Sequence, residues 1–254
     1  MDGSVRVPVT RFRGSDSSIE EDALAIEEPL EIRVGDRPLS VTMRTPGDDF
    51  ALAAGFLVTE SVIRGGGDIE NIRHWGSPNV VRVALREGVA MDWARLQRNF
   101  YTSSSCGVCG KTSIDAVRIA ARPLTSFRVS AAIIHALPDA LRARQTFFEA
   151  TGAIHAAGLF SAAGEPLVVA EDVGRHNAVD KVIGAFVLES RSFEDVILVV
   201  SGRGGFEIVQ KAAVAGIACV VAVGAPSSLA VELARETGMT LIGFAREGRF
   251  NVYT

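Results

Sequence analysis

The second half of the chain alternates fully apolar runs with helix-length segments, and this alternation constrains the fold more than any other feature of the sequence. The apolar runs predict strands over 196–200, 218–223 and 240–244, with helices over 207–215 and 227–237 between them. Strands that are apolar along their whole length are buried on both faces, as in sheets covered by helices. We therefore predict an α/β fold built on a mostly parallel sheet.

The residues ahead of this alternation predict further helices and strands of the same layer. A helical pattern covers 130–149, where Pro138 is expected to divide the helix and Gly152 to close it. Apolar strands over 153–161 and 167–171 join through a turn at Gly164, and a helix over 172–189 follows. We expect helices on both faces of the resulting sheet.

The first hundred residues mix short strands with one clear helix. The predicted elements are a hairpin over 30–34 and 39–44, a helix over 49–60 and a strand over 80–85. Acidic residues between 20 and 31 predict a solvated face. We expect a smaller N-terminal α+β subdomain over 1–125, ending in a mobile C-x-x-C loop and a short helix, and an α/β domain over 126–254.

Charge and hydropathy exclude two classes of partner. The 26 Lys and Arg residues against 30 Asp and Glu give a net charge of −4, which argues against sequence-independent binding of nucleic acid. No apolar run reaches the roughly 18 residues of a membrane span, and the first residues lack the apolar core of a secretory signal. We therefore expect a cytoplasmic protein with no membrane span.

Two of the three cysteines, Cys106 and Cys109, form a C-x-x-C pair in a segment rich in Ser and Gly. Lys111 and the amino end of a helix expected from Thr112 would both favour a thiolate. An accessible thiolate can attack a sulfur donor and then carry the additional sulfur. Cys219, inside an apolar strand, is expected to be a core residue.

Two other interpretations of the cysteine pair stay open. A zinc site would need a second pair of ligands, but the four histidines are scattered and no second C-x-x-C exists, so we expect no metal. A thioredoxin-like dithiol normally follows a strand at the front of a small fold, whereas this pair follows a run of serines in mid-chain.

Three polar segments lie at the ends of predicted strands. Glu171–Lys181 opens a helix after a strand and could bind an anion, or Asp172 could simply cap the helix. The Gly-rich turn over 201–205 could admit a phosphate or merely reverse the chain. Near the C-terminus, Arg246 and Arg249 could clamp a phosphate while Phe244 packs on a base, or form an ordinary basic loop.

Lysine is rare in this chain. Lys111, Lys181 and Lys211 are the only lysines among the 26 basic residues. A nucleotide bias toward arginine codons explains the imbalance. The three that remain would then mark positions where arginine cannot replace the compact ammonium group.

Together these segments resemble the FdhD-type formate dehydrogenase accessory sulfurtransferases. The resemblance rests on Ser-Ser-Cys-Gly-Val-Cys-Gly-Lys at 104–111, Thr-Gly-Ala-Ile-His-Ala-Ala at 151–157, Glu-Asp-Val-Gly-Arg-His-Asn-Ala-Val-Asp-Lys at 171–181, Ser-Gly-Arg-Gly at 201–204 and the last twelve residues. The match runs in consistent order over most of the chain.

The resemblance implies a sulfur carrier. Such proteins accept sulfur from a cysteine desulfurase as a persulfide, here on Cys106 with Cys109 as helper. They transfer it to the molybdenum bis-molybdopterin guanine dinucleotide cofactor before this enters the formate dehydrogenase apoenzyme. The implied cofactor-binding residues are Phe244, Ala245, Arg246, Glu247, Gly248 and Arg249. A homodimer is also implied. The alternative is a chaperone that binds the molybdenum cofactor without transferring sulfur.

The fold implied by the resemblance is a three-layer, cytidine-deaminase-like domain. A zinc deaminase needs H-x-E at one helix start and P-C-x-x-C at the next. Here the first reads His176-Asn177-Ala178 and the second, over 201–205, contains no cysteine. The metal ligands and the acid–base glutamate of a deaminase are therefore missing, although the crevice could still hold a guanine nucleotide.

Overall fold

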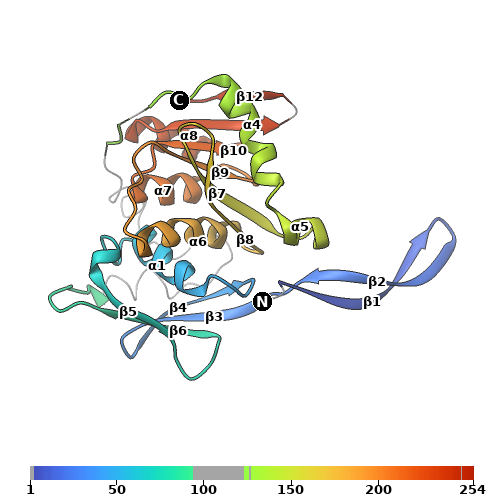
Figure 1. The fold of residues 1–254 in the computed structure, drawn as a ribbon, viewed down its shortest axis with the longest axis horizontal. Coiled ribbons are helices and arrows are strands. Elements are labelled where there is room, and N and C mark those ends of the chain that lie inside the picture. The colour runs from blue at the N-terminus through green and yellow to red at the C-terminus, as the bar shows by residue number, and fades with distance from the viewer. Residues whose placement is uncertain (1–2, 94–122, 126, 247) are drawn as a thin grey trace.

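The computed structural model describes residues 3–93, 123–125, 127–246 and 248–254, which form three sheets and the helices around them (Figure 1). The strands are β1 (Ser4–Arg13), β2 (Asp16–Ala25), β3 (Glu28–Val34), β4 (Arg37–Arg44), β5 (Ile69–His74), β6 (Val80–Leu85), β7 (His155–Ser161), β8 (Pro166–Asp172), β9 (Val196–Val200), β10 (Cys219–Ala222), β11 (Thr240–Arg246) and β12 (Arg249–Val252). The helices are α1 (Asp49–Thr59), η1 (Gly66–Asp68), α4 (Ala131–Arg142), α5 (Thr146–Thr151), α6 (Arg175–Leu188), α7 (Phe206–Ala215) and α8 (Ser228–Thr237).

The largest sheet has six strands in the order β12-β11-β10-β9-β7-β8. Strands β9, β10 and β11 are parallel, whereas β7 is antiparallel to both β8 and β9, and β12 is antiparallel to β11. The α/β fold is confirmed, but the expectation of a mostly parallel sheet is wrong. Burial on both faces makes a strand apolar whichever way it runs, so its composition does not reveal its direction.

Helices cover both faces of this sheet, as expected. Helix α4 packs on one face, where Leu137 and Leu141 meet Phe160 and Ile197 in one apolar cluster. Helices α6, α7 and α8 pack on the other face and contribute to a larger cluster. The specific cytidine-deaminase-like layering stays a prediction.

The four-stranded sheet has the order β4-β3-β6-β5. Helix α1 lies between this sheet and α6 (Figure 1). The sheet's inward residues, such as Ile32 and Val81, share the larger apolar cluster with α1, α6 and the six-stranded sheet. Hydrophobic contacts therefore connect the two halves of the chain, and the expected division at residue 125 stays a prediction.

Helices α1 and α6 cross with their backbones in contact. A Cβ added at Gly55 would overlap the carbonyl of Asp180, and one added at Gly184 would overlap the carbonyl of Ala51. Two glycines facing each other across the crossing allow this approach, because any larger side chain would separate the helices.

Pro138 does not divide the predicted helix over 130–149. It lies inside α4, and the chain leaves the helix at 143–145, one turn later. The carboxylate of Glu171, at the end of β8, accepts hydrogen bonds from the backbone N–H groups of Phe147 (2.9 Å) and Phe148 (2.8 Å) and so fixes the start of α5. This long-range contact is not visible in the local sequence.

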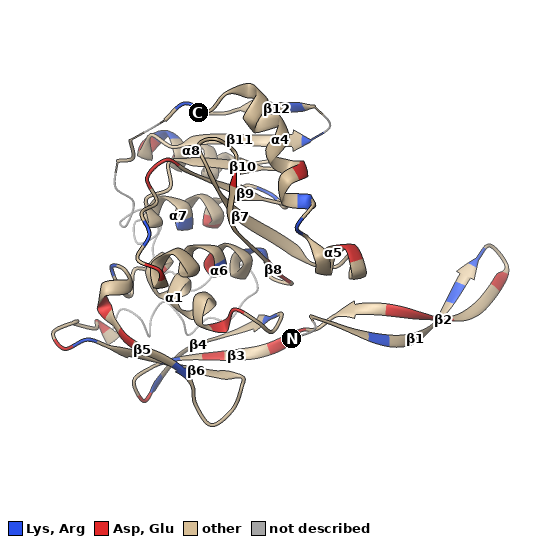
Figure 2. Ribbon diagram, in the orientation of Figure 1, with Lys and Arg blue, Asp and Glu red and all other residues tan. Residues whose placement is uncertain are grey.

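The first two strands form a separate hairpin that extends away from the body (Figure 1), and we call Ser4–Ala25 the arm. Basic residues lie on β1 and acidic residues on β2 (Figure 2), where Arg11 pairs with Glu20 at 3.1 Å. The acidic residues are therefore partly solvated, as expected, but they lie in a strand that the sequence did not predict. Residues from Val5 to Phe12 in β1 alternate loosely, whereas β2 is mainly polar and exposed and so lacks the apolar alternation that marks a strand.

No helix in the described ranges is both long and apolar enough to cross a membrane.

Candidate functional site

A cavity of about 820 Å³ lies at the end of the six-stranded sheet where β9, β10 and β11 finish. Its lining comes from α4, the start of β7 and the carboxyl ends of β9, β10 and β11. The lining residues include His135, Asp139, Arg142, Gln145, Phe148, Gly152, His155, Ser201, Val223, Arg246 and Gly248. The carboxyl ends of parallel strands are the usual place for a ligand crevice in an α/β sheet.

The cavity brings together three motifs that are far apart in the sequence. Gly152 and His155 come from the 151–157 motif, Ser201 from the Gly-rich turn, and Arg246 from the end of β11. The hydroxyl of Ser201 accepts a hydrogen bond from the backbone of Ala156 (2.9 Å), which joins the first two motifs. A cavity therefore lies at the ends of these strands, although no residue of the Glu171–Lys181 segment lines it.

The six residues predicted to bind a cofactor do not all lie at the cavity. Arg246 and Gly248 line the cavity, Ala245 is buried beneath α4, and Arg249 is exposed on β12. Glu247 lies outside the described residues. The structure therefore places two of the described members of this set at the cavity.

Phe244 shapes the turn that carries Arg246. Its φ of 53° is left-handed, which is unfavourable for an aromatic residue, and its N–H bonds to the carbonyl of Gly224 at 3.0 Å. The register of β11 against β12 shifts between Gly243 and Arg246. A bulge of this kind re-aims the following side chains, and here Arg246 reaches the cavity.

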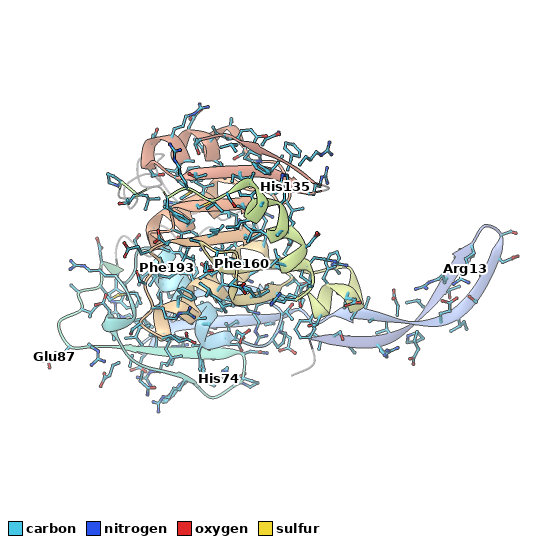
Figure 3. The ribbon with its side chains drawn as sticks, turned by 45° about the horizontal axis from the view of Figure 1, so that its top comes forward. Arg13, His74, Glu87, His135, Phe160 and Phe193 are labelled. Atoms are coloured by element: carbon cyan, nitrogen blue, oxygen red, sulfur yellow. The ribbon has the colours of Figure 1, made fainter. Side chains whose placement is uncertain are left out.

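The cavity wall combines cationic and aromatic groups. The guanidinium of Arg142 lies 4.1 Å from the ring centroid of Phe148, and Arg246 approaches from the other wall. His135, labelled on α4 in Figure 3, packs its ring against that of Phe250, with 4.8 Å between the two ring centroids. Two arginines and flat rings around one cavity suit a ligand that carries both phosphate and a planar base.

His155 lies where the cavity meets the amino ends of α6 and α7. Burial lowers the pKa of His155 from its ordinary value, and the charges of Arg175, His176 and Arg203 lower it further. The lowered pKa favours the neutral imidazole, which can donate one hydrogen bond and accept another. Beside it, His176 Nε2 lies 2.6 Å from a carboxylate oxygen of Glu207, which joins the first turns of α6 and α7.

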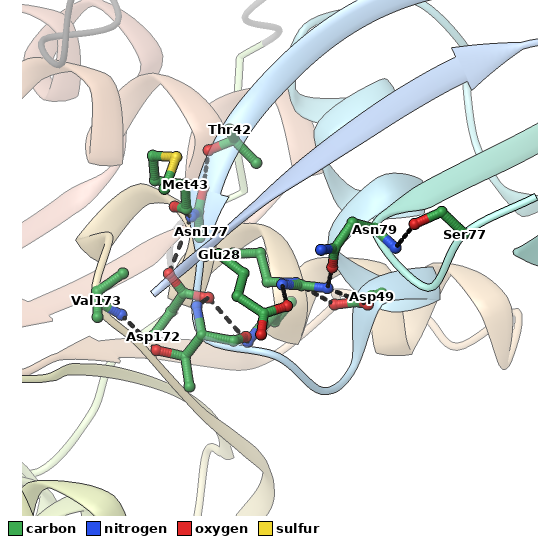
Figure 4. Close-up of polar contacts among 12 residues, drawn as sticks. Glu28, Thr42, Met43, Asp49, Ser77, Asn79, Asp172, Val173 and Asn177 are labelled. Carbon is green, nitrogen blue, oxygen red and sulfur yellow. Dashed lines mark hydrogen bonds and ion pairs between the residues drawn. The ribbon is translucent and has the colours of Figure 1, made fainter. Parts of the chain in front are cut away.

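Most of the polar segment Glu171–Lys181 serves the fold rather than a ligand. The carboxylate of Asp172 accepts hydrogen bonds from the backbone of Thr45 (3.2 Å), the backbone of Gly174 (2.8 Å) and the side chain of Asn177 (2.9 Å), as Figure 4 shows. It also pairs with the ammonium of Lys181 at 2.8 Å. The capping interpretation of Asp172 is wrong, because Gly174 is the N-cap of α6 and no side chain caps this helix. The buried Asp172 instead attaches α6 to the end of β4.

Both described lysines are buried, which agrees with the interpretation that arginine cannot replace them. Lys181 also donates to the carbonyl of Thr45 (2.9 Å). Lys211 donates to the hydroxyl of Thr59 (2.9 Å) and to the carboxylates of Asp180 (2.9 Å) and Glu60 (3.2 Å). Burial by itself would lower the pKa of Lys211, but these two carboxylates outweigh it and raise the pKa.

The three cysteines differ in position. Cys219 is fully buried in β10, as expected, and burial raises the pKa of its thiol to about 12, so it is not a nucleophile at neutral pH. Cys106 and Cys109 lie outside the described residues. Within the described residues, no group of three or more His, Cys, Asp and Glu side chains could hold a metal ion.

Sequence reasoning missed the wall of the cavity formed by α4. His135, Asp139 and Arg142 lie on the face of that helix opposite its apolar residues. The helical pattern identifies the buried face, but a polar face pointing into a cavity has the same pattern as one pointing into solvent.

Comparisons with known proteins match nearly the whole chain to one family. The model of the FdhD/NarQ family matches residues 25–254. A protein of Streptomyces coelicolor named "Sulfur carrier protein FdhD" is 51% identical, with 98% of this chain and 93% of that protein covered. A protein of Mycolicibacterium paratuberculosis with the same name is 49% identical, with 97% and 95% covered.

A solved structure gives the same result for the fold. The crystal structure of a protein described as a formate dehydrogenase accessory protein, from Desulfotalea psychrophila, superposes with a TM-score of 0.82 at 26% identity. The match covers 99% of this chain and 97% of that one. With the family model and the relatives at about half identity, it shows that this chain belongs to the FdhD/NarQ family.

Proposed function

We propose that this protein is a sulfur carrier, which accepts sulfur from a cysteine desulfurase and transfers it to the molybdenum bis-molybdopterin guanine dinucleotide cofactor for formate dehydrogenase. The observation that carries the proposal is 51% identity, over nearly the whole chain, with a protein named as a sulfur carrier. The cysteine pattern is consistent with it, because the buried Cys219 leaves Cys106 and Cys109 as candidate carriers.

In the proposed reaction, the Cys106 thiolate attacks the terminal sulfur of a persulfide on the desulfurase. A sulfur–sulfur bond to Cys106 forms, the bond within the donor persulfide breaks, and the donor cysteine leaves as a thiolate that takes up a proton. No external oxidant or reductant is needed for this exchange. Cys109 would prevent loss of the sulfur or return Cys106 to its thiol form.

The cavity at the sheet edge is the proposed binding site of the acceptor. Arg142 and Arg246 would hold phosphate groups of a dinucleotide arm, and Phe148 would pack on a ring. The molybdenum cofactor is here a substrate that the protein receives and passes on. The proposal places the reaction in the cytoplasm, with a homodimer holding the two dinucleotide arms in a cytidine-deaminase-like fold.

Cys106→Ala is expected to abolish sulfur loading. Intact-protein mass spectrometry after incubation with a cysteine desulfurase and cysteine, without reductant, should show one added sulfur atom on the wild-type chain, lost on thiol treatment. The Cys106→Ala chain should gain none, and Cys219→Ala should load normally because that thiol is buried.

The same variant separates the sulfur carrier from the chaperone alternative. A Cys106→Ala chain that still activates formate dehydrogenase would contradict the proposed sulfur transfer. It would favour a protein that only binds and hands over the cofactor.

Arg246→Ala is expected to weaken binding of GDP, a probe for one dinucleotide arm, by about 10- to 100-fold. Hydrogen bonds to charged groups contribute about 1.5–3 kcal/mol, and 1.4 kcal/mol corresponds to a factor of ten. Isothermal titration calorimetry would measure the change, with the exposed Arg235→Ala on α8 as the charge-matched control. Equal affinity of all three proteins would show that the cavity is not the nucleotide site.

A further inference from the structure

The outer face of the four-stranded sheet, opposite the face that packs on α1, carries a row of three arginines. Arg33 on β3, Arg82 on β6 and Arg73 on β5 are direct neighbours across the strands, and basic residues on β5 and β6 are visible in Figure 2. Like charges placed directly opposite each other destabilise a sheet. The row is therefore unfavourable for the isolated fold.

Carboxylates neutralise only part of this row. Glu31 lies 2.5 Å from Arg33, and the largely exposed Asp36 lies 3.0 Å from Arg82. Arg73 makes no ion pair within the described residues. Its guanidinium instead lies 4.8 Å from the ring centroid of Trp75, and that of Arg82 lies 4.5 Å from the same ring.

An exposed apolar row runs beside the arginines. Trp75 is 45% exposed, and Val41 and Met43 on β4 are 64% and 47% exposed. Val41 pairs with Glu31 and Glu31 with Val80, which places the apolar row on the same outer face. Arg, Trp and Met are the residue types enriched where proteins bind one another, and Trp and Arg contribute most to affinity.

The chemistry of the face indicates an acidic protein rather than a nucleic acid. The charge of Arg73, which has no ion-pair partner in the part of the chain that the structure describes, complements carboxylates. The adjoining row of exposed apolar side chains fits apolar side chains better than a phosphate backbone.

The position of the face relates it to the sulfur donor. Trp93, the last described residue before Cys106 in the sequence, lies under the guanidinium of Arg37, 5.1 Å from ring centroid to Arg37 Cζ. Arg37 pairs across the strands with the buried Val34, and Trp93 packs against the larger apolar cluster, so the last described residue before Cys106 lies at the inner face of this same sheet. Helix α4, whose residues line the cavity, lies beyond α1 and α6 as seen from this sheet (Figure 1).

We propose that the outer face of the β4-β3-β6-β5 sheet is the docking surface for the sulfur-donating protein, which presents carboxylates to Arg73 and Arg82 and an apolar side chain to Trp75. This inference rests on the proposed function, since it names the place where the desulfurase of that function binds.

Biolayer interferometry would test the proposal, with the cysteine desulfurase of the same genome immobilised and cysteine absent. The charge reversal Arg73→Glu/Arg82→Glu is expected to raise Kd at least tenfold and to flatten its dependence on salt. Trp75→Ala is expected to raise Kd with little change in the salt dependence. Arg73→Glu alone keeps the Asp36–Arg82 pair, so it should fold normally, as a thermal melt can verify, and still raise Kd.

The control carries the same change of charge at a distant place. Arg6 and Arg13 lie on the arm with side chains 75% and 74% exposed, and Arg13 is at its tip (Figure 3). Arg6→Glu/Arg13→Glu should leave Kd unchanged. At saturating desulfurase, the sheet variants should load Cys106 as fully as wild type, because docking and not chemistry is impaired.

Three outcomes would overturn the proposal. Equal Kd for wild type and Arg73→Glu/Arg82→Glu, with normal loading of Cys106, would reject the docking surface and leave the sulfur carrier intact. Retention of single-stranded RNA that these variants abolish, with desulfurase binding unchanged, would assign the face to nucleic acid. Absence of both binding and loading by the wild-type chain would reject the sulfur-carrier function together with the docking surface.

Discussion

Gly184→Ala is expected to destabilise the protein by at least about 3 kcal/mol, more than the addition of one methyl group usually does. Overpacking normally costs about 1–3 kcal/mol, because flexible side chains can move aside. At this site the added Cβ would overlap the backbone carbonyl of Ala51, so the whole of α1 would have to move away from α6. The free energy of unfolding in urea, followed by circular dichroism, would measure the loss.

Gly55→Ala at the same crossing should give a similar loss, because its Cβ would overlap the carbonyl of Asp180. Gly67→Ala is the matched control. A Cβ there meets no atom within 4 Å, so its effect should stay within about 0.5 kcal/mol. If Gly184→Ala unfolds at the same urea concentration as Gly67→Ala, the two helices do not need their backbones in contact.

Lys211→Met is expected to cost about 3–5 kcal/mol of stability, because it leaves the buried carboxylate of Asp180 without its main partner. Lys211→Arg should also destabilise the protein, since a planar guanidinium cannot place one nitrogen among Thr59, Glu60 and Asp180. Urea unfolding would again measure both changes.

The double variant Lys211→Met/Asp180→Asn tests the cause of that loss. It removes both charges and should recover a large part of the stability lost in Lys211→Met. A double variant as unstable as the single one would show that packing, not the unpaired charge, causes the effect.

The pH dependence of the wild-type chain gives an independent check on this pair. The pKa of Lys211 is raised in the folded protein, so its contribution should be complete below its ordinary pKa of 10.5 and should be lost as pH rises through the raised value. The Lys211→Met/Asp180→Asn variant should lack this alkaline loss.

The elements with a strong local pattern were predicted well. The hairpin of β3 and β4, helix α1 and the alternation from β9 to β11 follow from apolar spacing and turn residues that lie close together in the sequence. Strands β2, β5 and β12 were missed, because they lie at exposed edges or outside the body and carry polar side chains. The direction of β7 was also missed, since a doubly buried strand reads the same in either direction.

The candidate site could be predicted only in part. The sequence identified Ser201 and Arg246 as polar residues at strand ends, and it singled out 151–157 only through the family resemblance. The carboxyl ends of parallel strands in one sheet lie close together. The sequence could not show that α4 forms the other wall, nor that Asp172 and Lys181 would be buried as partners. A polar side chain at a helix start looks the same in sequence whether it faces a ligand or another part of the chain.

The sequence by itself determined the class of fold, many core positions, the family motifs and the rarity of lysine, because these depend on residue type and on spacing along the chain. The tertiary structure alone decided which polar groups meet: Arg246 with Arg142 across a cavity, Lys211 with Asp180 between helices, and three arginines across neighbouring strands. These contacts depend on the register and direction of the strands and on where the helices cross. Such features are set by packing between segments far apart in the sequence, where no local pattern records them.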